Sequence, residues 1–173
     1  MTGYQQSILY LVGSQLGDRF TVRSVDRHYI EAVEDVFVGY TPYLQKNSPG
    51  KRDYWVLKSP LVKKPTLSEV SDEQGFARGF IELQGTLASW THRGRARLRL
   101  RIYGSEDDLQ FLQRCLPAKE KKIQHVNTEN GSTCALYYQS GAEIFDIFRY
   151  IDGEPRNDRL WTQWEAELIS RLV

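Results

Sequence analysis

The chain has 173 residues, of which 40% are hydrophobic and 26% are charged, and its formal net charge at pH 7 is +1. This composition excludes a disordered or fibrous protein, and the length suits one domain, residues 1–173, with its own core. No apolar run reaches the roughly 18 residues that cross a bilayer, and residues 1–7 lack the order of a signal peptide. We therefore expect an intracellular, cytoplasmic protein with no membrane partner.

The first third of the chain alternates between helical and strand patterns. Apolar residues in the range 4–17 recur at helical period and predict a buried helix that ends near Gly17. Residues 19–25 alternate, with Phe20 and Val22 on one face, as in a half-buried strand. Residues 29–37 predict a second helix, and residues 43–57 predict two short strands around a turn at 47–50.

The same order recurs after a linker at residues 60–73. A helix is predicted over 74–84, strands up to Tyr103, a helix over 107–116 and a hairpin around the turn at 129–131. We therefore divide the chain into a first half (1–59), the linker, a second half (74–151) and a helical tail (152–173). Residues 44–46 align with 123–125, and residues 54–59 align with 135–140.

Counting positions locates a difference between the copies. There are 31 positions from Gly13 to Leu44 and 44 from Gly79 to Ile123, so the second copy holds 13 more residues, in the range 86–99. Because 13 residues are about one β-hairpin, the count predicts that the first half lacks one hairpin.

The tail and the cysteines are expected to belong to the core. Leu160, Trp161 and Trp164 share one helical face, which predicts core packing, with a stacking platform for bases as the alternative. Cys115 and Cys134 show no metal-binding spacing and are predicted to be buried thiols.

Two pairs of glycines occur at helical spacing. Gly13 and Gly17 are four residues apart, as are Gly75 and Gly79, although glycine inside a helix costs about 1 kcal/mol relative to alanine. We interpret the pairs as the contact between two helices whose backbones almost touch. Loop or C-cap positions are the alternative for Gly17 and Gly85.

These glycines carry a resemblance to a known family. Residues 9–18, LYLVGSQLGD, and residues 77–85, ARGFIELQG, resemble two LAGLIDADG motifs, so the chain resembles the LAGLIDADG homing endonucleases over about residues 4–151. The resemblance implies a mixed α+β fold of two pseudo-symmetric αββαββ halves, with a saddle of antiparallel sheet on double-stranded DNA. A C-terminal helix follows, and the internal symmetry implies a monomer.

The resemblance also implies a catalytic site. The family's acidic position falls on Asp18 in the first copy and on Gln84 in the second, so Asp18 would be a Mg²⁺ ligand at a helix C-terminus, with a solvated loop aspartate as the alternative. Metal-assisted cleavage uses carboxylates to hold Mg²⁺, so Gln84 weakens or removes one half-site. Lys46 and His125 occupy matching hairpin positions and would supply basic catalytic groups, with plain surface positions as the alternative.

A row of arginines is the clearest sign of a partner. Every second residue is an arginine in one segment, which predicts one basic strand face: Arg93, Arg95, Arg97, Arg99 and Arg101. No acidic residue interrupts them, so we expect the face to bind a polyanion, extended by Arg19 and Arg23. Pairing with acidic residues elsewhere in the fold is the alternative.

Two classes of function follow. One is a DNA-binding protein with Mg²⁺-dependent endonuclease or nicking activity, and the other is a non-catalytic transcriptional regulator or RNA-splicing protein. RNA therefore remains open as a partner beside DNA, and a protein module for an acidic partner is a third reading. The sequence shows none of the common phosphate-loop, dinucleotide, zinc-protease or serine-hydrolase motifs.

Overall fold

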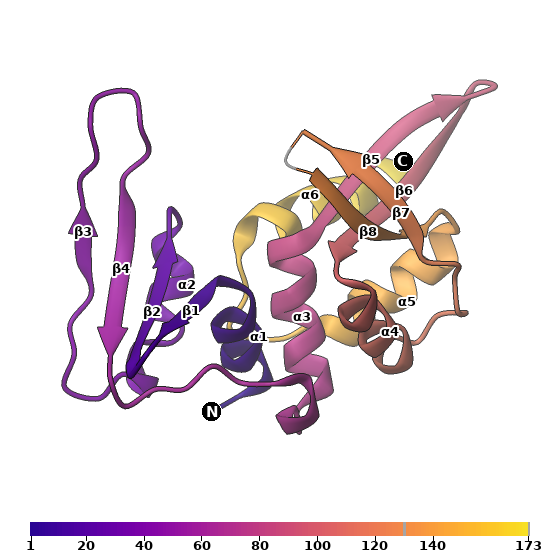
Figure 1. Cartoon of the computed structure of the whole chain (residues 1–173). Helices are drawn as coiled ribbons and strands as arrows, with labels where there is room; N and C mark the ends of the chain where they lie inside the picture. Colours follow the sequence, from indigo (N-terminus) through magenta and orange to yellow (C-terminus); the bar gives the residue numbers. More distant parts are fainter. Residues whose placement is uncertain (130, 173) are drawn as a thin grey trace. The chain divides into compact units, whose positions relative to one another are not determined.

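The computed structural model describes residues 1–129 and 131–172, so Asn130 of the predicted turn at 129–131 lies outside the described residues. The chain forms two compact units, residues 1–79 and 80–173. Each unit contains a four-stranded antiparallel sheet with helices packed against it (Figure 1). The expected mixed α+β class is confirmed. Among the described residues, no helix is long and apolar enough to span a bilayer.

The first unit follows the order helix, hairpin, helix, hairpin. Its elements are α1 (Gly3–Val12), β1 (Gly13–Leu16), β2 (Arg19–Ser24), α2 (Arg27–Glu31), β3 (Tyr43–Gln45) and β4 (Tyr54–Ser59). The sheet order is β1-β2-β4-β3, and α1 and α2 pack against β2. Short 3-10 turns occur at Glu34–Val36 and Leu67–Glu69, the latter inside the predicted linker. Helix α3 (Glu73–Gln84) then begins.

Two predictions for this unit are wrong. The first helix ends at Val12, and Gly13 adopts extended backbone (φ −83°, ψ 140°) because it starts β1. Beyond Val12, Leu16 alone continues the apolar spacing that suggested a longer helix, and its side chain is 83% exposed. The hairpin expected to be missing is present as β1 and β2, and the corresponding hairpin of the second copy, in residues 85–104, has longer strands.

The close helix contact is confirmed for Gly75 and Gly79. A Cβ added at Gly79 would lie 1.9 Å from Ser7 Oγ, and one at Gly75 would lie 3.0 Å from the backbone nitrogen of Tyr4. Asp72 reinforces this contact because its carboxylate accepts backbone hydrogen bonds from both Gly3 and Gly75 (2.9 Å each). One side chain therefore satisfies donors near the starts of α1 and α3. Gly13 and Gly17 take no part, since both lie beyond the end of α1.

The second unit repeats the order with longer strands. It contains the end of α3, then β5 (Gly85–His92), β6 (Arg95–Gly104), α4 (Glu106–Cys115), β7 (Gln124–Thr128) and β8 (Gly131–Tyr138). Helices α5 (Gly141–Ile151) and α6 (Asp158–Leu172) complete it. The sheet order is β5-β6-β8-β7. Gln45 pairs with Tyr54 and Gln124 pairs with Ala135, in agreement with the alignment of the two copies.

Helices α5 and α6 close the core of this unit. Phe148 stacks on Trp164 (ring centroids 4.4 Å apart) and meets Trp161 edge-on, so the predicted core packing of the tail tryptophans is confirmed. The Trp161 indole also donates to Glu82 Oε1 at 2.7 Å. Helix α5 was not predicted, although its apolar residues Ile144, Ile147, Phe148 and Ile151 have helical spacing. Both cysteines are buried thiols, as expected.

Candidate nucleic-acid interface

The hairpin of β5 and β6 carries the arginine row. Arg93 (φ 50°) and Gly94 (φ 74°) form its two-residue turn, the positive-φ geometry that matches the twist of paired strands. Arg93 therefore lies in the turn and not in the strand, which corrects the predicted five-residue row to four strand arginines. The turn also sets the register, in which His92 pairs with Arg95 and Trp90 with Arg97.

The far end of this hairpin is a two-stranded arm. Strand β8 pairs with β6 only from Leu100 to Gly104, whereas β5 pairs with β6 along its whole length. Figure 1 shows the β5–β6 hairpin extending past the other strands of its sheet. Arg95 and Arg97 lie on this arm and both are exposed.

The four arginines share one sheet face with no counter-charge. Leu98, Leu100 and Ile102 occupy the opposite face and are buried. Among the described residues, no carboxylate lies within ion-pair distance of Arg95, Arg97, Arg99 or Arg101. The alternative of acidic pairing within the fold is therefore not realised, and the positive charge faces solvent.

Aromatic rings alternate with the inner two arginines. Arg99 lies over Trp90 (5.3 Å to the ring centroid) and near Tyr137 (5.9 Å), and Arg101 lies near Tyr137 (5.5 Å) and Tyr103 (5.6 Å). These distances are within the range of cation–π attraction. We call this set, Trp90, Arg99, Tyr137, Arg101 and Tyr103, the aromatic–arginine ladder. Arg101 Nη1 also donates to the Tyr103 hydroxyl at 2.5 Å, and this bond raises the pKa of the guanidinium.

The sheet of the first unit shows a weaker version of the same chemistry. Arg19 and Arg23 alternate with the buried Phe20 and Val22, so they face solvent as predicted. Arg23 lies 5.6 Å from the Tyr54 ring and donates to Gln45 Oε1 at 3.2 Å. Lys58 on β4 lies 5.8 Å from the ring of Tyr43.

The ends of α1 and α3 have the same local geometry. A Cβ at Gly13 would lie 2.2 Å from the Leu9 carbonyl oxygen, and a Cβ at Gly85 would lie 2.3 Å from that of Ile81. In both places a glycine allows the chain to turn directly from a helix into a strand. Gly13 is thus equivalent to Gly85, and Val12 is equivalent to Gln84.

Comparison with solved structures identifies this arrangement. The chain is similar to the N-terminal LAGLIDADG domain of DUF199/WhiA, with a TM-score of 0.54 and 14% identity, over 91% of this chain and 84% of that one. It is also similar to full-length DUF199/WhiA from Thermatoga maritima, with a TM-score of 0.54 and 13% identity, over 97% of this chain and 66% of that one. The chain has a LAGLIDADG-like fold. No protein-family model and no curated protein matches the sequence.

The LAGLIDADG-like fold places Asp18 differently from the prediction. Asp18 follows Gly17 (φ 60°) in the turn between β1 and β2 and is exposed, so it does not lie at a helix C-terminus. It lines a shallow hollow with Arg19, Tyr40 and Lys58. The offset arose because the glycine taken as the helix end was Gly17, whereas the helix ends before Gly13.

The donor groups of the LAGLIDADG helices do not fit Mg²⁺. Val12 offers no ligand atom, and Gln84 offers an uncharged amide oxygen, whereas Mg²⁺ sites in proteins are built around carboxylates. Within residues 1–129 and 131–172, no group of three or more acidic, histidine or cysteine side chains is arranged to hold a metal ion.

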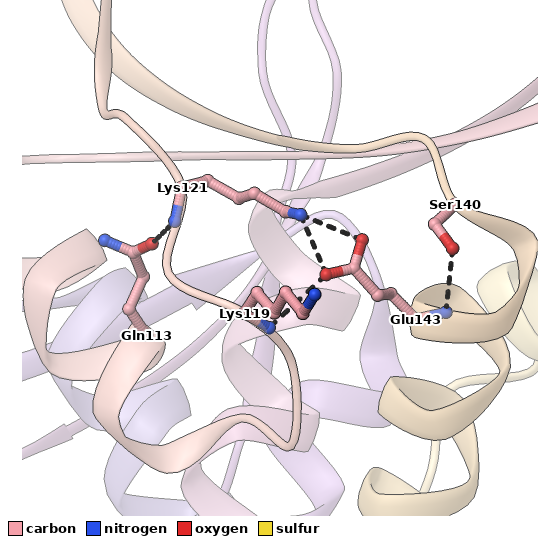
Figure 2. Close-up of polar contacts among 5 residues, drawn as sticks. All are labelled: Gln113, Lys119, Lys121, Ser140 and Glu143. Carbon is pink, nitrogen blue, oxygen red and sulfur yellow. Dashed lines mark hydrogen bonds and ion pairs between the residues drawn. The ribbon is translucent and has the colours of Figure 1, made fainter.

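The two predicted basic catalytic residues belong to different units. Lys46 is exposed just after β3, in the first unit. His125 pairs across the strands with Cys134, on the face opposite Tyr137, and its Nδ1 lies 3.4 Å from Cys134 Sγ. Another basic side chain of this unit, Lys121, is already paired within the fold. Its ammonium group forms an ion pair with Glu143 (2.7 and 2.9 Å), and its backbone nitrogen donates to Gln113 (Figure 2).

Sequence reasoning missed the aromatic half of the ladder. Trp90 is 36% exposed, and Tyr137 is half-buried beside the arginines. The dipeptide Arg93-Gly94 contained the necessary signal, because a two-residue turn there places Trp90 opposite Arg97. The position of Tyr137 depends on the pairing of β6 with β8, which is distant in sequence.

Proposed function

We propose that this protein binds double-stranded DNA on the exposed faces of its sheets and does not cleave it. The observation that carries the proposal is the face of four strand arginines without a carboxylate partner among the described residues. Like charges side by side destabilise a sheet unless a polyanion neutralises them. Phosphate oxygens accept paired, charge-assisted hydrogen bonds from guanidinium groups.

The β5–β6 arm favours a duplex DNA. A B-form major groove admits a two-stranded β-ribbon, whereas the deep and narrow major groove of A-form RNA does not. The arm presents Arg95 and Arg97 at the end that no third strand flanks. Double-stranded DNA is therefore the preferred partner over double-stranded RNA.

The absence of cleavage follows from the side chains at the helix ends. Metal-assisted hydrolysis needs carboxylates to fix the ion between the attacking water and the leaving oxygen. Val12 and Gln84 supply none, and Asp18 lies in a strand turn. We group the protein with the non-catalytic regulators or splicing factors that the sequence suggested as an alternative to an endonuclease.

The test combines binding and cleavage. Fluorescence anisotropy with a labelled random-sequence duplex across a salt series should show tight binding at low salt and a steep log-log slope. Arg95→Ala with Arg97→Ala should reduce that slope by up to about 1.8, since each lost phosphate contact removes roughly 0.9. Arg149→Ala, which removes an exposed arginine on α5, is the matched control and should leave the slope unchanged.

The cleavage arm uses supercoiled plasmid with Mg²⁺ or Mn²⁺. We expect a band shift without nicking, and equal behaviour of wild type and Asp18→Asn. Nicking that disappears in Asp18→Asn would show a one-acid nuclease instead. No affinity for the duplex at low salt would favour the acidic-protein partner, and tighter binding of double-stranded RNA would reverse the choice of nucleic acid.

A further inference from the structure

We infer that Trp90 and Tyr137 are positioning residues: they hold Arg99 and Arg101 in a fixed orientation for nucleic-acid phosphates and do not themselves contact the ligand. The inference rests on the proposed function and gives different roles to the arginines of the β6 face. Arg95 and Arg97 are the exposed, unrestrained cations of the arm, and Arg99 and Arg101 are a preorganised anchor.

The contacts of the ladder restrict both arginines. Each guanidinium lies within 6 Å of two aromatic rings, and Tyr137 contacts both. The rings come from three strands, β5, β6 and β8, so the sheet itself sets their spacing. Arg95 and Arg97 are more exposed and have no cation–π contact among those found in the described residues. A free arginine loses rotamer entropy on binding, and a held one has already lost it.

The hydrogen-bonding state of the two arginines supports a ligand role. The Nε atoms of Arg99 and Arg101 are buried and have no hydrogen-bond partner among the described residues, so the terminal nitrogens are the donors that a ligand can reach. Because rings flank the guanidinium groups, the donors that remain for a ligand lie in the guanidinium plane. Such a donor edge matches the paired oxygens of a phosphate.

The inference predicts a change in affinity without a change in the salt dependence of binding. Removing an aromatic ring leaves the number of cations, and hence the number of displaced counterions, unchanged. A Tyr137→Leu variant should therefore bind the duplex more weakly with an unchanged salt slope. Because the Tyr137 ring restrains two arginines that would otherwise lose rotamer freedom on binding, its removal should weaken the affinity by about 5- to 150-fold.

Conservative variants identify the mechanism. Tyr137→Phe keeps the ring and should bind like wild type to within about twofold. Arg99→Lys keeps the charge but loses the planar group that stacks on rings, so it should weaken binding with the slope unchanged. Thermal unfolding of each variant shows whether the fold is intact, and the comparison of Tyr137→Phe with Tyr137→Leu separates ring from hydroxyl.

A double-mutant cycle gives the decisive result. If Tyr137 acts through the arginines, then Tyr137→Leu should have no further effect on affinity once Arg99 and Arg101 are both alanine. The same loss in both backgrounds would overturn the inference, because it would mean that the ring contacts the nucleic acid directly. No loss in the wild-type background would also overturn it, while leaving the proposed function intact if Arg95→Ala with Arg97→Ala still lowers the slope. Absence of any duplex binding by wild type would overturn both.

Discussion

At the scale of single residues, the absence of a side chain at Gly79 allows α1 and α3 to pack. The space that a Cβ would need is occupied by Ser7 Oγ, and Tyr4 Cδ2 lies 3.1 Å away. The cost of glycine in a helix is thus offset by the close approach of the two backbones. Ser7 itself is buried and donates to the Tyr4 carbonyl at 2.7 Å, so it cannot turn away without losing this bond.

Gly79→Ala should destabilise the protein by about 1–3 kcal/mol, because the new methyl group overpacks a helix contact. The measurement is urea unfolding followed by circular dichroism. Ser7→Gly in the same chain should recover part of the loss, since it removes the clashing hydroxyl. Gly141→Ala is the matched control: its Cβ would meet no atom within 4 Å, so it should be neutral or slightly stabilising. Equal effects at Gly79 and Gly141 would contradict this explanation.

At the scale of secondary-structure elements, β8 presents one face to the arginines and the opposite face to the core. Tyr137 faces the arginines, and the next residue, Tyr138, is 1% exposed on the helix side. Burial, with a contribution from the nearby Glu143 carboxylate, raises the pKa of Tyr138 to about 12. Lys121, paired with Glu143 in Figure 2, lies 5.8 Å from the Tyr138 ring.

The raised pKa of Tyr138 predicts a loss of stability in alkali. The unfolded chain releases this proton near pH 10, and the folded chain holds it until about pH 12. The contribution is therefore fully present below pH 10 and declines by about 2–3 kcal/mol as the pH rises to 12. Urea unfolding of wild type and Tyr138→Phe at pH 9 to 11 tests this: the difference in unfolding free energy should shift in favour of the variant as pH rises. A parallel decline in both would show that Tyr138 does not titrate differently on folding.

At the scale of the whole molecule, α3 belongs to both compact units. Residues 73–79 pack within the first unit, and Phe80, Ile81 and Glu82 pack within the second. Phe80 contributes to the contact at Gly104, and Glu82 accepts the hydrogen bond of Trp161. The two units therefore share one continuous helix, and we expect strain at Gly79 to reach the residues that follow it in the second unit.

Hydrogen exchange measured by mass spectrometry should detect this connection. In Gly79→Ala, the backbone amides of residues 80–84 should exchange faster than in wild type, because their hydrogen bonds reach back to carbonyls near the strained position. Gly141→Ala should leave α3 unchanged. Acceleration confined to residues 1–79 would show that the units open independently.

The sequence by itself determined most of the element order and the basic face. Apolar periodicity located α3, α4 and β2, and the alternation of arginine with apolar residues located the outer face of β6, because these signals are local. Local periodicity failed at Gly13, where Val12 and Leu16 continue a helical spacing although the chain has already turned into a strand. Because of that error, the family's acidic position was assigned to Asp18, whereas the structure assigns it to Val12.

Only the tertiary structure decided which residues meet. Tyr137 reaches Arg99 and Arg101 because β8 pairs with β6 across more than 30 positions of sequence, and Ser7 meets Gly79 because α1 crosses α3. Neither contact has a local signature. The equivalence of Val12 and Gln84 likewise depends on the tertiary structure, because it follows from the similar backbone turns at Gly13 and Gly85. Side-chain pattern reports which face of an element is buried, whereas the register of distant strands and the approach of helices depend on packing of the whole chain.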